Sequence, residues 1–131
     1  MIASNDDAAT QPDSGQANIA HLTMLASTSE RFGLIWSGIS EDLNVNLILL
    51  VDGKGVEEHV NAELDVLVIC LFGQGSITID GLERPFGAGD VVILEKRSVR
   101  AFRAGPGRFA YLTCHRRRGG IWPAVTGKDP D

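Results

Sequence analysis

Short apolar segments separated by turn-forming residues make up most of the chain from about residue 19 onward. Gly, Asp, Asn and Pro separate these segments at intervals of roughly ten residues, and none of them shows a convincing 3.6-residue period. The segments are 19–26, 32–39, 43–51, 56–60, 64–72, 76–80, 91–94, 99–103 and 108–115. The pattern predicts an all-β domain, built as a sandwich or a barrel.

Two of the intervening turns have a physical basis in their sequence. Asp80-Gly81 lies between two strand-like segments, and an Asp-Gly pair readily supplies the two positive φ angles of a type I′ hairpin turn. Gly105-Pro106-Gly107 separates the last two segments and is expected to form a further hairpin. We therefore expect antiparallel strands that follow one another along the chain.

The two ends of the chain differ from the middle. Residues 1–16 are acidic, small and polar and lack a periodic apolar pattern, which predicts a flexible tail. Residues 17–118 form the expected β-barrel domain, and 119–131 are expected to form a C-terminal arm with Trp122 as its apolar anchor. A chain of 131 residues suits one such domain.

The apolar segments are too short to cross a membrane. The longest, from Val66 to Phe72, is far below the roughly twenty residues that a membrane helix requires. The N-terminus has neither the basic start nor the apolar stretch of a secretory signal, so we expect a cytoplasmic protein. Cys70 and Cys114 both lie in apolar strand-like segments, where reduced thiols are expected rather than a disulfide.

Charge is unevenly distributed along the chain. The net charge is −5, but residues 84–118 carry nine basic and two acidic side chains. The acidic total disfavours nucleic acid as a partner, whereas a local cationic region could hold a small anion.

A pattern of glycine and histidine spacing extends from Gly53 to Arg103. Five residues separate Gly53 from His59, and the later markers are Gly73-Gln74-Gly75, Asp80-Gly81 and Pro85-Phe86-Gly87-Ala88-Gly89-Asp90. This pattern resembles the two glycine-rich motifs of the cupin family and the hairpin between them. The resemblance implies a single jelly-roll β-barrel of two antiparallel sheets, commonly assembled as a homodimer.

The residues at the family's metal-binding positions depart from its pattern. In metal-binding cupins, two histidines and a glutamate of the first motif and a histidine of the second bind one ion inside the barrel. Here His59 matches the first position, Asn61 stands at the second and Arg100 at the last, while either Asp65 or Val66 falls at the glutamate position. A guanidinium has no lone pair to offer and is permanently positive. We therefore predict no metal ligands and no cofactor.

Strand alternation predicts what surrounds these positions inside the barrel, because side chains two residues apart share a face. Val66, Val68, Cys70 and Phe72 would form an apolar wall, and Phe102 would share the face of Arg100. The predicted ligand-binding residues are His59, Asn61, Cys70, Phe72, Arg100 and Phe102.

A buried arginine is costly unless a carboxylate or a phosphate meets it. We therefore expect Arg100 to anchor a small anionic or oxygen-rich molecule, with Asn61 and His59 fixing its orientation. An internal salt bridge from Arg100 to Glu95, Glu63 or Asp65 is the structural alternative.

Two enzymatic alternatives also remain open. The first is a metal-independent isomerase, epimerase or lyase acting on a sugar or keto acid, with His59 as the catalytic general base. The second is a metal-dependent enzyme with a rearranged site of His59, Cys70 and either Asp65 or Glu63. A homodimer would form by pairing the segment 17–26 or the segment 119–127 with a sheet edge of the partner.

Overall fold

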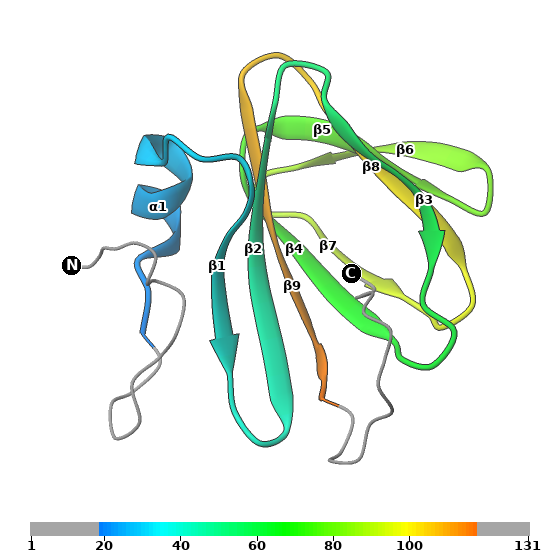
Figure 1. The fold of residues 1–131 in the computed structure, drawn as a ribbon. Coiled ribbons are helices and arrows are strands. Elements are labelled where there is room, and N and C mark those ends of the chain that lie inside the picture. Colours follow the sequence, from blue (N-terminus) through cyan, green and yellow to red (C-terminus); the bar gives the residue numbers. More distant parts are fainter. Residues whose placement is uncertain (1–18, 118–131) are drawn as a thin grey trace.

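Two antiparallel β-sheets face each other in the computed structural model, which describes residues 19–117 (Figure 1). The five-stranded sheet has the order β1 (Gly33–Ile39), β2 (Leu43–Val51), β9 (Arg108–Arg116), β4 (Val66–Phe72) and β7 (Val91–Leu94). The four-stranded sheet has the order β3 (Gly55–Val60), β8 (Val99–Ala104), β5 (Gln74–Ile79) and β6 (Leu82–Gly87). The predicted fold class, a jelly-roll arrangement of two antiparallel sheets, is confirmed.

The main hydrophobic core lies between the two sheets. Alternate residues of β4 contribute Val66, Val68 and Cys70, which are buried, as alternation predicts. The facing sheet and the neighbouring strands complete the core with Leu50, Ile77, Phe86, Leu94, Phe102, Ala104, Phe109 and Tyr111. Burial of this apolar surface is the main force holding the sheets together.

A second, smaller core covers the outer face of the five-stranded sheet. Helix α1 (Leu22–Thr28) packs there through Ala26, with Leu22 and Leu25 beside it, and lies mainly against β4 and β9. Leu47 and Leu49 of β2 belong to the same core. The expectation of a strand over 19–26 is therefore wrong, and so is the suggestion that this segment extends a sheet as a strand. Leu22, Leu25 and Ala26 recur at the helical spacing that lets one face of a single helix cover the sheet.

The predicted turn at Asp80-Gly81 is confirmed, because Asp80 has φ 50° and Gly81 has φ 85° between the paired strands β5 and β6. The prediction of a hairpin at Gly105-Pro106-Gly107 is wrong, since this turn joins β8 of one sheet to β9 of the other. It lies against the connection from β2 to β3, which also changes sheets: the Gly107 N–H donates to Asp52 Oδ1 at 2.7 Å. Two crossings side by side close this end of the structure.

Close backbone packing explains one glycine of the cupin-like pattern. Gly73 links β4 to β5 with φ 84°, and a Cβ there would lie 1.9 Å from the carbonyl oxygen of Arg108. A side chain at this position would be strained by its φ angle and would also collide with β9.

Several expectations fall partly or wholly outside the described residues. The acidic tail of 1–16 and the arm of 119–131 are not part of 19–117. Within the described part of the chain, the structure contains no helix that is long and apolar enough to span a membrane.

Candidate functional site

Arg100 is enclosed between the two sheets. It lies on β8, where His59 of β3 and Ile79 of β5 are its cross-strand neighbours. Its exposed fraction is 0%. Nη1 donates to the carbonyl oxygen of Ser98 at 3.1 Å and to its hydroxyl at 3.4 Å. The guanidinium is thus held by its own strand, two residues back along the chain.

The remaining guanidinium nitrogens are unpaired. Nε and Nη2 of Arg100 are buried and have no hydrogen-bond partner among the described residues. Glu63, Asp65 and Glu95 are exposed, and none accepts a hydrogen bond from Arg100. Asp65 instead accepts the N–H of Lys96 at 2.9 Å. The structure therefore does not show the hydrogen-bonded internal salt bridge that the sequence offered as an alternative.

Asn61 contributes a further unpaired donor. It is 3% exposed, and its Oδ1 accepts the N–H groups of Glu63 at 3.0 Å and Leu64 at 2.9 Å. Nδ2 is buried without a hydrogen-bond partner among the described residues. Since turning the amide over would set its NH₂ group against two N–H donors, the orientation of the side chain is fixed.

Asn61 and the guanidinium of Arg100 lie at the same end of the structure. The carbonyl oxygen of Asn61 accepts the N–H of Arg97 at 2.7 Å, which joins the turn after β3 to the turn before β8. The second of these turns contains Ser98, to which Arg100 donates. All the unpaired buried side-chain atoms of the described residues thus belong to these two residues, and all are N–H donors.

His59 lies beside Arg100 on the neighbouring strand. It is half-buried and faces the interior, because directly paired residues of adjacent strands share a face. The pairing of β3 with β8 shifts register between Val56 and His59. Nδ1 lies 3.0 Å from the carbonyl oxygen of Glu57.

The apolar wall differs from the expectation at one residue. The pairing of β4 with β9 shifts register between Cys70 and Phe72, so that Phe72 pairs with Ala110 and packs in the outer core beneath α1. Phe72 is therefore not part of the interior wall. Phe102 does face the interior, where its ring stacks on that of Tyr111 at 4.2 Å between centroids and 11° between planes. Sequence alone could not show the facing of Tyr111.

Cys70 is a buried thiol on β4, two residues before Phe72. Burial raises its pKa above the ordinary value of 9.0; a hydrogen bond with the Phe72 backbone opposes this rise, and the charge of Asp90 adds to it. Sγ also lies 3.5 Å from the carbonyl oxygen of Ala110. Cys70 is therefore a protonated wall residue at neutral pH rather than a thiolate nucleophile.

The polar residues of the interior do not fit a metal ion. Within residues 19–117 no three His, Cys, Asp or Glu side chains lie together where they could hold one, and this includes the rearranged set with Cys70 and Asp65. The free atoms of Asn61 and Arg100 are N–H donors, which offer no lone pairs and repel a cation. What this site lacks is an acceptor of hydrogen bonds.

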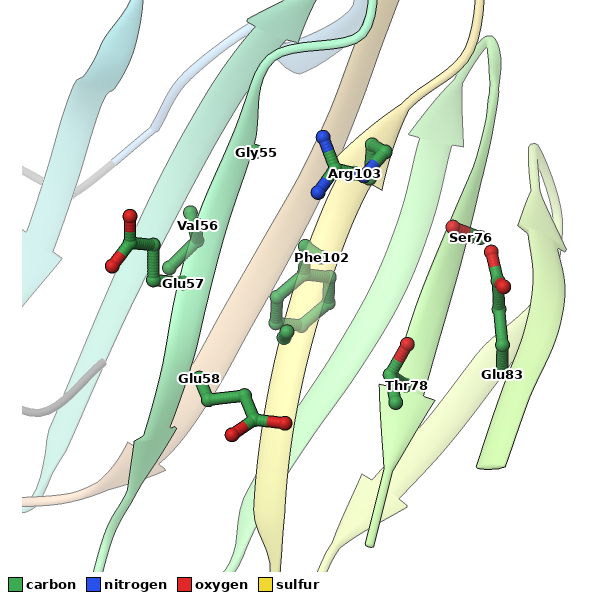
Figure 2. A pocket seen from close by; sticks show the side chains of 10 residues that line it. Gly55, Val56, Glu57, Glu58, Ser76, Thr78, Glu83, Phe102 and Arg103 are labelled. Carbon is green, nitrogen blue, oxygen red and sulfur yellow. The ribbon is translucent and has the colours of Figure 1, made fainter. Parts of the chain in front are cut away.

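A separate hollow of about 490 Å³ lies on the outer face of the four-stranded sheet. Figure 2 shows its side chains, which come from β3, β8, β5 and β6: Glu57 and Glu58, Arg103, Ser76 and Thr78, and Glu83. None of the predicted ligand-binding residues except Phe102 lines it. None of the sequence patterns described above points to this hollow, and its charged groups are exposed.

Solved structures share this fold. A cupin superfamily protein from Desulfitobacterium hafniense is 20% identical over 82% of this chain and 94% of its own, with a TM-score of 0.63. A protein with a double-stranded β-helix domain from Klebsiella pneumoniae is 16% identical over 77% and 90%, with a TM-score of 0.64. An RmlC-like cupin from Shewanella frigidimarina is 14% identical over 63% and 71%, with a TM-score of 0.55.

These likenesses concern the fold, since their sequence identities are low. No protein-family model and no curated protein matches the sequence significantly. Sheet order, the glycine-bearing turns and the structural likenesses agree on one architecture. The chain has the cupin fold.

Proposed function

We propose that this protein is a metal-free binding module, which holds a small anionic or oxygen-rich molecule between its sheets with Arg100 as the anchor. The observation that carries the proposal is the set of buried N–H groups on Arg100 and Asn61 that have no hydrogen-bond partner within residues 19–117. His59, Cys70 and Phe102 would complete the surroundings of the ligand.

The energetic cost of this arrangement supports a missing partner. A buried donor without a partner costs about 1–3 kcal/mol, and a charged one costs more. A protein-derived carboxylate would offset this cost, but none accepts a hydrogen bond from Arg100 among residues 19–117. An oxygen-bearing ligand would satisfy the same donors.

Entry of a ligand requires movement. Arg100 has no contact with solvent, so a ligand can reach it only if the turns at 61–65 and 95–98 separate. Association that waits for such an opening is slower than the 10⁵–10⁷ M⁻¹s⁻¹ that is typical of preformed sites between proteins. We therefore expect slow binding that speeds up with temperature.

Titration calorimetry against small organic acids and sugar phosphates tests the proposal. Wild type and the control variant Arg103→Ala, which alters the outer face of the same strand, should bind one of these anions equally well. Arg100→Ala should lose that binding while keeping the circular dichroism spectrum of a folded β protein. Equal binding by wild type and a folded Arg100→Ala variant would contradict the proposal.

A homodimer is proposed on separate grounds. Beyond the area that α1 covers, the outer face of the five-stranded sheet carries paired apolar residues: Val91, Ile93, Leu67, Ile69, Cys114 and Val45. Val91 is 60% and Ile93 58% exposed. Leu67, Ile69, Cys114 and Val45 are half-buried beside them. A contiguous, partly exposed apolar patch of this kind is typical of an interaction surface.

A second copy of this chain suits the patch better than a charged partner does. Six uncharged residues on one flat face bring no like charges together across a two-fold axis, although the whole chain has a net charge of −5. Light scattering after size exclusion should give the dimer mass for wild type and the monomer mass for Ile93→Lys. Leu82→Lys, at a position 55% exposed on the other sheet, should remain dimeric. A monomeric wild type at high concentration would contradict the dimer.

A further inference from the structure

We infer that the ligand is a short monocarboxylic acid with an apolar body, held bidentately on the Nε–Nη2 edge of Arg100. The inference rests on the proposed function and names the ligand class of that site. It follows from which nitrogens are free, how many charges are buried and how little space there is.

The free nitrogens form one edge of the guanidinium. Both hydrogen bonds of Arg100 leave from Nη1, towards the carbonyl and the hydroxyl of Ser98. Nε and Nη2 remain, and their N–H bonds point in parallel from the same side of the planar group. Two parallel donors match the two oxygens of a carboxylate, as in bidentate arginine–carboxylate pairs. A ligand with a single oxygen would leave one of them unpaired.

Asn61 supplies a third donor for the same group. Its Oδ1 is occupied by the turn, so only the Nδ2 hydrogens are available. Each carboxylate oxygen has two lone pairs, and the pair that Arg100 does not use can accept from Nδ2. One carboxylate could thus satisfy all three orphaned nitrogen atoms.

Charge balance selects a monoanion. Among the buried side chains of the described residues, Arg100 is the charged one; Asn61 and Thr113 are neutral. A carboxylate neutralises it, whereas a phosphate dianion would leave a net negative charge in an apolar interior, where an unpaired charge is costly.

The surroundings select a short apolar body. Val66 and Leu94 pair with each other beside the two turns, and Ile79 pairs with Arg100. Val66 and Leu94 are almost fully buried, and Arg100 is fully buried beside them. A ligand that enters where the two turns separate also displaces these apolar side chains, and a small apolar chain replaces their contacts best.

Titration of the full-length protein with propionate tests the inference, followed by calorimetry and by the NMR signal of the Arg100 Nε–H group. Propionate should bind wild type and the control Arg103→Lys equally well. Arg100→Lys keeps the charge but loses the two parallel N–H donors, so the affinity of this variant for propionate should fall about tenfold or more. Propionamide, inorganic phosphate and succinate should bind wild type at least about tenfold more weakly than propionate.

The outcomes separate the inference from the proposed function. Phosphate or succinate that binds through Arg100 more tightly than propionate would overturn the monocarboxylate and leave anion binding standing. Equal propionate binding by wild type and Arg100→Lys would overturn the bidentate fork. No Arg100-dependent binding of any of these anions would overturn both proposals.

A second variant keeps the test decisive if Arg100→Lys fails to fold. Asn61→Asp retains the oxygen that holds the turn and places a carboxylate at the orphaned Nδ2 position. It should abolish propionate binding while the protein remains folded. Unchanged propionate affinity in Asn61→Asp would overturn the role assigned to this end of the barrel.

Discussion

Strand β8 carries two arginines whose surroundings are opposite. Arg103 points to the outer face, is exposed, and donates from Nη1 to the carbonyl oxygen of Gly53 at 3.0 Å beside the acidic hollow. Arg100, three residues earlier, is enclosed between the sheets with two nitrogens unpaired. Solvent can accept hydrogen bonds from the remaining N–H groups of Arg103. No described residue accepts one from Nε or Nη2 of Arg100.

The comparison shows that the hollow and the unpaired buried donors lie at different places in the molecule. The hollow has volume, but its carboxylates and Arg103 are exposed, so a ligand there must compete with water for every hydrogen bond. The enclosed site has little space, yet a hydrogen bond from its donors to an acceptor would be strong, because no water competes for them. We therefore place the ligand inside the barrel rather than on its surface.

Replacing each arginine by methionine should give the largest contrast. Arg100→Met removes an unpaired buried charge at similar volume, so the free energy of unfolding of the ligand-free protein should rise by about 1–4 kcal/mol. Arg103→Met should change it by less than about 0.5 kcal/mol, because the side chain is exposed. Urea denaturation measures both values. Strong destabilisation by Arg100→Met would mean that the guanidinium has partners in the free protein.

Asn61 extends the comparison to the second residue with an unpaired buried donor. Asn61→Ala leaves the N–H groups of Glu63 and Leu64 without their acceptor, and the free energy of unfolding should fall by about 1–3 kcal/mol. Asn61→Asp should lose much less, because the acceptor remains. Ser76→Ala, in the outer hollow, should stay within about 0.5 kcal/mol of wild type. Equal losses in Asn61→Ala and Asn61→Asp would show that the turn does not depend on this oxygen.

The two cysteines test the same contrast between interior and outer face with a smaller effect. Cys70 has a raised pKa because of burial, and a thiol reagent near pH 8 should modify the half-buried Cys114 first. In the unfolded chain the Cys70 thiol ionises near 9.0, while the folded chain retains the proton to higher pH. Stability should therefore fall as pH rises from about 9 through the folded pKa.

Cys70→Ala should lose this alkaline decline, and Cys114→Ala should keep it. Faster modification of Cys70 than of Cys114 in the native protein would show that the interior opens more readily than the packing implies.

Much of the fold follows from the sequence because its signals are local. Alternation within Val66–Cys70 and the Asp80-Gly81 turn depend on neighbouring residues, and both match the structure. Helix α1 was missed because its segment is short. Three apolar residues are too few to distinguish a helical period from the pattern of a strand. The turn at 105–107 gave no sign of which sheet each adjoining strand joins.

The candidate site was only partly predictable, for similar reasons. Arg100 could be placed inside from its position in the cupin-like pattern and from alternation. The facing of Phe72 depends on a register shift in β4, which no residue type signals. Which guanidinium nitrogens Ser98 occupies is a matter of atomic geometry, and the unpaired edge could be found only in the structure.

A high-resolution crystal structure of the whole chain grown with propionate would show whether a carboxylate occupies the unpaired edge of Arg100. We predict planar carboxylate density within hydrogen-bond distance of Nε and Nη2 of Arg100 and of Nδ2 of Asn61. A protein carboxylate seated on that edge, or an edge that stays empty at saturating propionate, would contradict it.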